Sequence, residues 1–152
     1  MKLSEYAQIA EVVSGIAVVI TVLLLVFEVR NNTAAVESAT YDALVSDMAT
    51  WRMAIVSNPS LLENLYATRE LNSEGIDGIR ILERQYMLMA SFHIYERAYI
   101  QWRAGNIDGE AWERFERQIC LNQGPGFKQG MGPFIKEAST ESFYEFWDEC
   151  VE

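Results

Sequence analysis

Two side chains with the potential for metal chemistry stand one helical turn apart in this sequence. His93 and Glu96 have the spacing that places two residues on one face of a helix, where together with Glu83 or a C-terminal carboxylate they could bind a metal ion. Di-iron sites in helical bundles need two Glu-x-x-His pairs, whereas His93 is the only histidine of the chain. We therefore interpret His93 as a histidine at the edge of the core that is hydrogen-bonded to a neighbour, and we expect neither a metal nor a cofactor.

The only cysteines, Cys120 and Cys150, both fall on apolar stripes. Buried thiols behave as small apolar groups and are usually inert. We therefore expect free, unreactive thiols, which fit a cytoplasmic domain. Two alternatives stay open, namely a Cys–His nucleophile pair with His93 and a Cys120–Cys150 disulfide if the domain faces the periplasm.

No other group of residues forms a catalytic pattern. Tyr and Trp stripes could line a pocket for a lipid or a pigment, but at helical spacing such residues more often form a core. Gly124-Pro125-Gly126 lacks the Gly-Lys-Ser/Thr ending and the preceding strand of a phosphate-binding loop. The sequence therefore predicts a protein that is not an enzyme.

A membrane-spanning helix is the strongest pattern of the chain. Val12 to Phe27 is a run of sixteen residues without a charge, of which twelve are Val, Ile, Leu or Phe. At about 1.5 Å per residue this helix is about 24 Å long, and Ile9, Ala10 and Val29 extend it toward the roughly 30 Å of a hydrocarbon core. The twelve apolar side chains contribute roughly −4 to −7 kcal/mol to insertion.

Two other interpretations of this segment are weaker. A cleaved signal peptide needs a basic start and a small residue at its cleavage site, but Glu5 and Glu11 interrupt the start and Phe27-Glu28-Val29-Arg30 is a poor site. A buried helix of a soluble bundle is the other alternative.

The orientation of the span is weakly specified, because Lys2 lies before it and Arg30 after it. A short tail that also carries Glu5 translocates easily. We therefore expect the tail outside and the helical domain in the cytoplasm.

One face of the predicted span carries small and weakly polar residues at spacings of three and four. With the carboxylate at its boundary this face comprises Ala7, Ala10, Ser14, Ala17, Thr21 and Glu28. Small residues on one stripe let a second helix approach closely in lipid. We expect this face to pack on another transmembrane helix, from a second copy or from a different protein, although small residues are also common in spans that pack on nothing.

The net charge of −10 restricts the partners of the protein. An acidic surface repels phosphate backbones, so we expect no nucleic-acid binding. It also disfavours a domain that lies flat on anionic lipid. The C-terminal end carries six carboxylates and no basic residue after Lys136. This run is either a solvated helix face or a docking surface for a basic protein partner.

The rest of the chain predicts helices and no strands. No Pro or Gly occurs between Ile16 and Asn58, so one helix can run from about Ser4 to Val56, with a soft point at Asn31-Asn32-Thr33. Its second half carries a core-facing stripe of Tyr41, Leu44, Met48, Trp51 and Ile55.

Local signals divide the remaining sequence into shorter helices. They predict helices from Pro59 to about Thr68, from Asn72-Ser73 to Ala104 before Gly105, and from a cap at Asp108 to about Leu121. Gly124 to Pro133 is predicted to be a loop or a broken helix, and Ser139 or Thr140 caps a last helix.

The long helix that ends at Ala104 carries two apolar stripes. The first consists of Ile81, Gln85, Leu88, Phe92, Tyr95, Tyr99 and Trp102. The second consists of Leu82, Tyr86, Met89, His93 and Ile100. A helix that is apolar on two faces is expected at the centre of the bundle.

Several short motifs follow one another along nearly the whole chain, each occurring once. They are Val29-Arg30-Asn31-Asn32-Thr33, Phe92-His93-Ile94-Tyr95-Glu96, Gly105-Asn106-Ile107-Asp108 before Trp112, Pro125-Gly126 and a final aromatic helix. In this order the sequence resembles a family of uncharacterised small bacterial proteins, often from marine proteobacteria, with one N-terminal transmembrane helix and an all-helical domain. The run Gly130-Met131-Gly132-Pro133 departs from the family, where continuous helix is more usual. The resemblance implies fold and membrane placement, and it brings no activity with it.

These observations predict an all-α protein. Residues 1–30 form a short tail and a single N-terminal transmembrane helix, and residues 31–152 form a small, acidic, antiparallel helical bundle whose first helix can continue the span. We expect a non-catalytic accessory or scaffold subunit of a larger assembly in the bacterial inner membrane. The alternatives are a self-associating homo-oligomer, and a membrane-tethered enzyme or lipid or pigment binder that uses the aromatic-rich domain.

Overall fold

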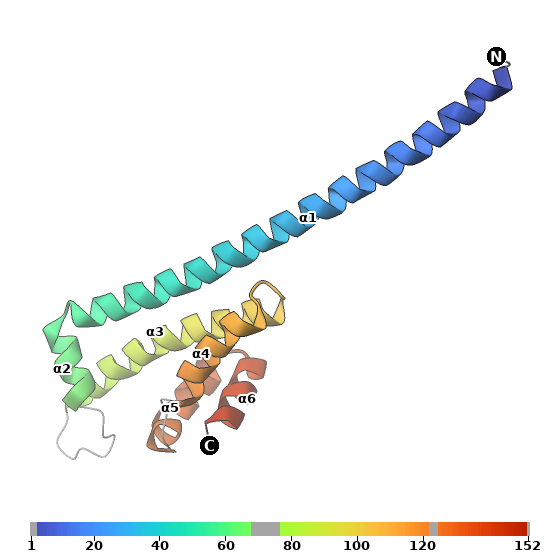
Figure 1. The fold of residues 1–152 in the computed structure, drawn as a ribbon. Coiled ribbons are helices and arrows are strands. Elements are labelled where there is room, and N and C mark those ends of the chain that lie inside the picture. Colours follow the sequence, from blue (N-terminus) through green and yellow to red (C-terminus); the bar gives the residue numbers. More distant parts are fainter. Residues whose placement is uncertain (1–2, 68–76, 122–124, 152) are drawn as a thin grey trace. The chain divides into compact units, whose positions relative to one another are not determined.

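The computed structural model describes residues 3–67, 77–121 and 125–151, and every regular element within these ranges is a helix (Figure 1). The helices are α1 (Leu3–Val56), α2 (Pro59–Ala67), α3 (Gly78–Arg103), α4 (Gly109–Leu121), α5 (Pro125–Ala138) and α6 (Glu141–Cys150). The all-α prediction is confirmed, and the span and the first bundle helix are one continuous helix. The chain divides into two compact units, Met1–Glu37 and Ser38–Glu152.

The first unit is the N-terminal part of α1. Its apolar side chains stay exposed along the predicted span, from Val12 at 61% to Phe27 at 65%. The hydroxyl of Thr21 donates to the carbonyl oxygen of Ala17 at 2.8 Å, so it is satisfied inside the helix. α1 is long and apolar enough to cross a membrane, and the protein buries none of its most apolar window.

The second unit has an apolar core built by the C-terminal part of α1 and by α3 to α6. Its most completely buried large side chains are Leu44, Ile119, Met131, Ile135, Phe143, Trp147 and Val151. The predicted stripe of α1 is confirmed, since Leu44 and Met48 are buried in this core. The indole N–H of Trp51 also donates to the carbonyl oxygen of Met87 on α3, at 3.0 Å.

α3 contacts α2, α4 and α5, as expected of a central helix, but only part of its length is enclosed. Of its first predicted stripe, Phe92, Tyr95 and Tyr99 are buried. The second stripe was wrong as a core face, because Leu82, Tyr86, His93 and Ile100 are exposed. The enclosing helices pack around the C-terminal turns of α3, whereas its N-terminal turns are tied to α2 through Asn64, whose amide donates to the carbonyl oxygen of Arg80 at 3.0 Å.

Local capping signals place most helix ends correctly. α2 begins at Pro59, and the predicted last residue, Thr68, lies outside the described residues. The predicted start of the long helix at Asn72-Ser73 also lies outside them; α3 begins at Gly78 after the cap Asp77. Gly105 ends α3 with a φ of 74°, a left-handed conformation that glycine adopts without strain. The carboxylate of Asp108 accepts from the N–H of Ala111 at 2.7 Å, as predicted for a cap.

α5 corrects the predicted loop between Gly124 and Pro133. Pro125 is the first residue of the helix, a position that needs no backbone donor, and Pro133 lies within it. Met131 and Ile135 are 1% and 0% exposed, so the burial of apolar side chains holds this glycine-rich segment helical. The glycine and proline residues indicated a weak helix propensity, which predicted a loop or a broken helix. The burial of Met131 and Ile135 could not be inferred from that pattern. Gly124 itself lies outside the described residues.

The start of α6 is fixed from a distant helix. Thr140 is the N-cap residue, as predicted, but its side chain makes no capping bond. Its backbone N–H instead donates to a carboxylate oxygen of Glu96 on α3, at 2.5 Å. The hydroxyl of Ser139 donates back to the carbonyl oxygen of Ile135 on α5. Glu96 therefore plays the part that a glutamate within the helix plays in a capping box.

We predict that Trp147→Ala destabilises the full chain by about 3 to 5 kcal/mol, because a fully buried indole is removed from the core. Thermal unfolding in detergent, followed by circular dichroism, measures the loss. Tyr86→Ala is the matched control, since Tyr86 is 71% exposed and its loss should change the stability by less than about 0.5 kcal/mol. Equal melting temperatures for the two variants would contradict this assignment of the core.

Candidate functional site

His93 and Glu96 lie close together on α3. His93 Nδ1 is 3.9 Å from Glu96 Oε2, and the His93 side chain is 56% exposed. Glu83 stands ten residues before His93, about 15 Å along the helix, and its carboxylate accepts from the amide of Asn64 at 2.6 Å. Within residues 3–67, 77–121 and 125–151, no group of three potential ligands comes together. The prediction of a histidine at the edge of the core that is hydrogen-bonded to a neighbour is not confirmed, because His93 is exposed and 3.9 Å is too long for a hydrogen bond to Glu96.

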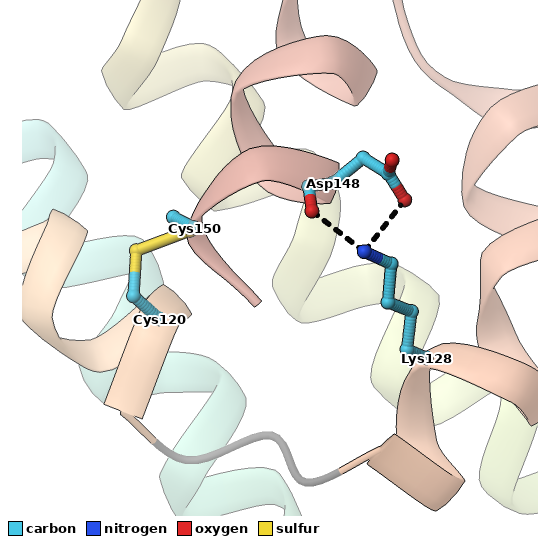
Figure 2. Close-up of a disulfide and its surroundings, with 4 residues drawn as sticks. All are labelled: Cys120, Lys128, Asp148 and Cys150. Carbon is cyan, nitrogen blue, oxygen red and sulfur yellow. Dashed lines mark hydrogen bonds and ion pairs between the residues drawn. A yellow bond between two sulfur atoms is a disulfide. The ribbon is translucent and has the colours of Figure 1, made fainter. Parts of the chain in front are cut away.

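Cys120 and Cys150 form a disulfide that joins the end of α4 to the end of α6 (Figure 2). Their Cα atoms are 5.3 Å apart, which is within the normal range for bridged cysteines. The same end of α6 is also bound from α5, because Lys128 Nζ lies 3.0 Å from a carboxylate oxygen of Asp148 and donates to its carbonyl oxygen at 2.7 Å. Two contacts thus fix the C-terminal turn of α6 to two neighbouring helices.

The expectation of free thiols was wrong, since no cysteine of the described chain is free. The sequence placed both residues correctly on apolar stripes, and both are half-buried beside the core. It could not show that the stripes of α4 and α6 face each other in register. The disulfide also removes the thiolate that a Cys–His nucleophile pair with His93 would need.

The aromatic residues of the domain pack against one another. Trp102 and Trp112 stack with ring centroids 5.1 Å apart and an interplanar angle of 12°. Tyr99 stacks on Phe146 at 5.3 Å, and the Arg103 guanidinium lies 5.7 Å from the centroid of the Tyr99 ring. Each of these rings thus packs against another side chain of the domain. This arrangement favours a core over a ligand pocket.

Tyr95 is one of two buried tyrosines in this core, with Tyr99. Burial raises the pKa of Tyr95, because the phenolate would lose its hydration, and the charge of Arg52 acts in the opposite direction. The phenol of Tyr95 therefore ionises less readily than that of an exposed tyrosine.

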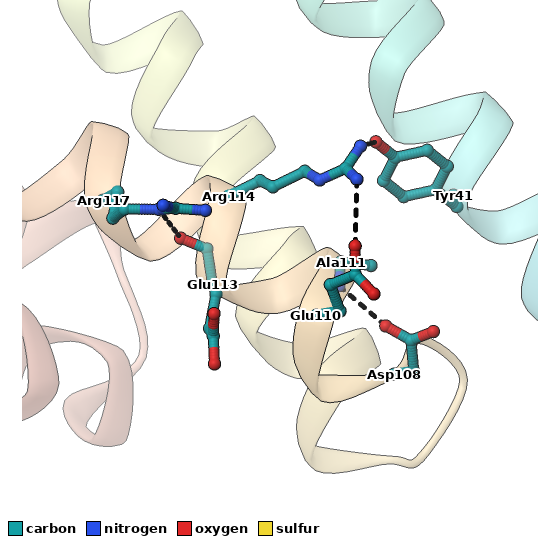
Figure 3. A network of polar contacts seen from close by, with 7 residues as sticks. All are labelled: Tyr41, Asp108, Glu110, Ala111, Glu113, Arg114 and Arg117. Atoms are coloured by element: carbon teal, nitrogen blue, oxygen red, sulfur yellow. Dashed lines mark hydrogen bonds and ion pairs between the residues drawn. The ribbon is translucent and has the colours of Figure 1, made fainter.

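Polar contacts at the surface connect α1 to the other helices of the second unit. Arg114 on α4 donates to the hydroxyl of Tyr41 at 3.1 Å and to Glu110 at 3.2 Å (Figure 3). Asp47 on α1 pairs with Arg97 on α3. These pairs are exposed to solvent, where they orient helices more than they stabilise them. Spacing along one helix can reveal the Arg114–Glu110 pair, whose residues lie four apart on α4, but it cannot reveal the two pairs that join α1 to another helix.

The predicted packing face of the span lies on α1 within the first unit. Ala10, Ser14, Ala17, Thr21 and Glu28 are all exposed. The side chain of Ala7 lies outside those that the structure describes. Their neighbours from Ala10 to Val36 are exposed as well, so exposure does not single out this face, and its pairing with another transmembrane helix stays a prediction.

The acidic C-terminal helix is solvated on one side and buried on the other. Glu141, Glu145 and Glu149 follow one another at intervals of four and are exposed. Phe143 and Trp147 on the opposite side are buried. This is the arrangement of an amphipathic surface helix. A basic protein partner for this face stays a prediction.

Searches against protein-family models, curated proteins and solved structures find no match for this chain. The class of the protein therefore rests on its own features. These are one exposed apolar helix fit to cross a membrane and a helical domain whose core is closed by its own aromatic side chains.

If the small-residue face packs on another span, Ala17→Leu should weaken helix association several-fold, because a larger side chain keeps the backbones apart. A reporter assay for transmembrane helix association in a bacterial membrane measures the effect. Val19→Leu, about 200° away around the helix, is the matched control and should leave association unchanged. Equal association of Ala17→Leu and the unaltered chain would remove the predicted interface.

Proposed function

We propose that this protein is a single-pass membrane protein of the bacterial inner membrane whose helical domain is a non-catalytic accessory or scaffold subunit. The observation that supports this most strongly is the exposure of the apolar part of α1. Among the residues that the structure describes, the side chains from Val12 to Phe27 are all exposed and none of the most apolar window is buried. A lipid bilayer is the environment in which such a helix is favourable.

The course of α1 supports an anchor over a cleaved leader. The helix continues through Glu28, Val29 and Arg30 and on to Val56, where it contributes Ile55 to the buried side chains. A signal peptide ends in small residues at a cleavage site. Here the segment after the apolar run is helical and carries bulky and charged side chains.

Several potentially reactive side chains are bonded to other residues of the domain, which supports a role without catalysis. Cys120 and Cys150 are joined to each other, and Glu96 accepts the N–H of Thr140. Glu83 accepts from Asn64. Each of these groups already has a structural partner, and the aromatic residues form the core. Contact surfaces are what the domain offers instead, through the exposed side of α6 and the small-residue face of the span.

Membrane anchoring is tested by charging the span. Val19→Arg with Leu23→Arg adds about 5 to 7 kcal/mol at the bilayer centre, which cancels the roughly −4 to −7 kcal/mol of the apolar side chains. We expect the unaltered chain in the membrane pellet after ultracentrifugation, resistant to alkaline carbonate, and the double variant largely lost from it. Val36→Arg with Val45→Arg adds the same charge at exposed positions beyond the span and should stay in the pellet. An unaltered chain that is soluble without detergent would disprove the anchor.

The accessory role is tested by gentle detergent extraction and native mass measurement. A complex with other polypeptides supports the proposed role. A multiple of the mass of one chain, 17.3 kDa, supports the self-associating alternative instead. A lone chain that carries a bound lipid or pigment would contradict both and favour a ligand-binding domain.

A further inference from the structure

The Cys120–Cys150 disulfide bears on which side of the membrane the domain occupies. These are the only cysteines of the chain, and they are thirty residues apart in sequence. Structural disulfides persist in oxidising compartments, whereas cytosolic thiols are kept reduced. A bridge built into the domain therefore points to the compartment in which the domain folds.

The packing around the bridge shows that the two cysteines are held together by the fold. Ile119 and Val151, the immediate neighbours of Cys120 and Cys150, are 0% and 2% exposed. α4 and α6 are in contact, and Lys128 fastens Asp148 from the other side of α6 (Figure 2). A buried neighbour on α4 and another directly after α6 thus flank the pair, whose Cα atoms are 5.3 Å apart. Once the core has formed, the two sulfur atoms are within bonding reach of each other.

The charges around the span leave this orientation open. Lys2 stands before the apolar run and Arg30 after it, and the next basic residue is Arg52. Basic residues near the span ends therefore favour neither side. A domain of this length crosses the membrane largely regardless of its charge, so its acidity is no obstacle. The disulfide is then the feature that distinguishes the two orientations.

We propose that residues 38–152 fold on the oxidising side of the membrane, which is the periplasm for a bacterial inner membrane, and that the residues before Val12 face the cytoplasm. This inference rests on the proposed membrane anchor and reverses the orientation expected from the sequence. In the oxidation step the two thiols lose two protons and two electrons and form the Cys120–Cys150 bond. A disulfide of a thiol-oxidising protein takes up the electrons and protons and is reduced to two thiols.

Thiol counting in intact cells tests the bridge. Cells that express the full chain are quenched in acid, and the protein is denatured and treated with a polyethylene-glycol maleimide with or without prior reduction. We expect no adduct before reduction and two adducts after it. Cys120→Ser with Cys150→Ser is the control and should give none in either sample. Two adducts without reduction would overturn the inference.

The orientation is tested separately on the unaltered chain with two C-terminal fusions. We expect activity from alkaline phosphatase, which folds only outside the cytoplasm, and no fluorescence from a green fluorescent protein exported in the unfolded state. The reverse pair of results would overturn the inference. Because the cysteines are intact in these fusions, the test does not depend on a variant that fails to fold.

Impermeant labelling of spheroplasts gives a second reading of the same orientation. Glu145→Cys in the Cys120→Ser, Cys150→Ser background should react with a membrane-impermeant maleimide, since Glu145 is exposed on α6. Ser4→Cys in the same background should react only after the membrane is permeabilised. The opposite labelling would overturn the inference while leaving the membrane anchor intact. A chain found in the soluble fraction of these samples would instead overturn the anchor, and this inference with it.

Discussion

The free energy of keeping the apolar run between Val12 and Phe27 out of water is the constraint that governs the rest of this molecule. Large apolar side chains line most of this helix there, more than half exposed in most cases, and none of its most apolar window is buried by the residues that the structure describes. Hydrocarbon satisfies such a surface at no cost to the backbone, because a helix forms all of its hydrogen bonds internally. The hydroxyl of Thr21, bonded to the carbonyl of Ala17, follows the same rule.

The second unit buries part of its apolar surface in a core of its own, although Tyr66, Ile79 and Tyr86 among others stay exposed. Aromatic rings carry much of this burial, and α3 is the helix around which they gather, with Tyr99 in ring contact with both Trp112 and Phe143. Directional contacts then fix the helix ends, as Glu96 does for Thr140. The domain thus combines non-directional burial at its centre with a few specific bonds at its edges.

Sequence reasoning succeeded where the signal is local and failed where it is not. Pro59, Gly105 and Asp108 act through their own backbone geometry, so the helix boundaries beside them were predictable. α5 was missed because its helicity depends on the burial of Met131 and Ile135 by distant helices. The exposed second stripe of α3 was misjudged for the converse reason, since periodicity shows that a face is apolar and not that another element covers it. The candidate site depended likewise on distant packing, which aligned Cys120 with Cys150 and left His93 exposed beside Glu96.

The disulfide between α4 and α6 also changes the result of cutting a peptide bond between the two cysteines. It closes a covalent ring that contains α5 and nearly all of α6. A protease that cuts once anywhere inside this ring releases no fragment, because both new ends remain attached through sulfur. The nicked protein keeps its mass, apart from one added water, and separates into two pieces only when the bond is reduced. A domain made in this way tolerates a single cut in its C-terminal quarter that would divide an open chain.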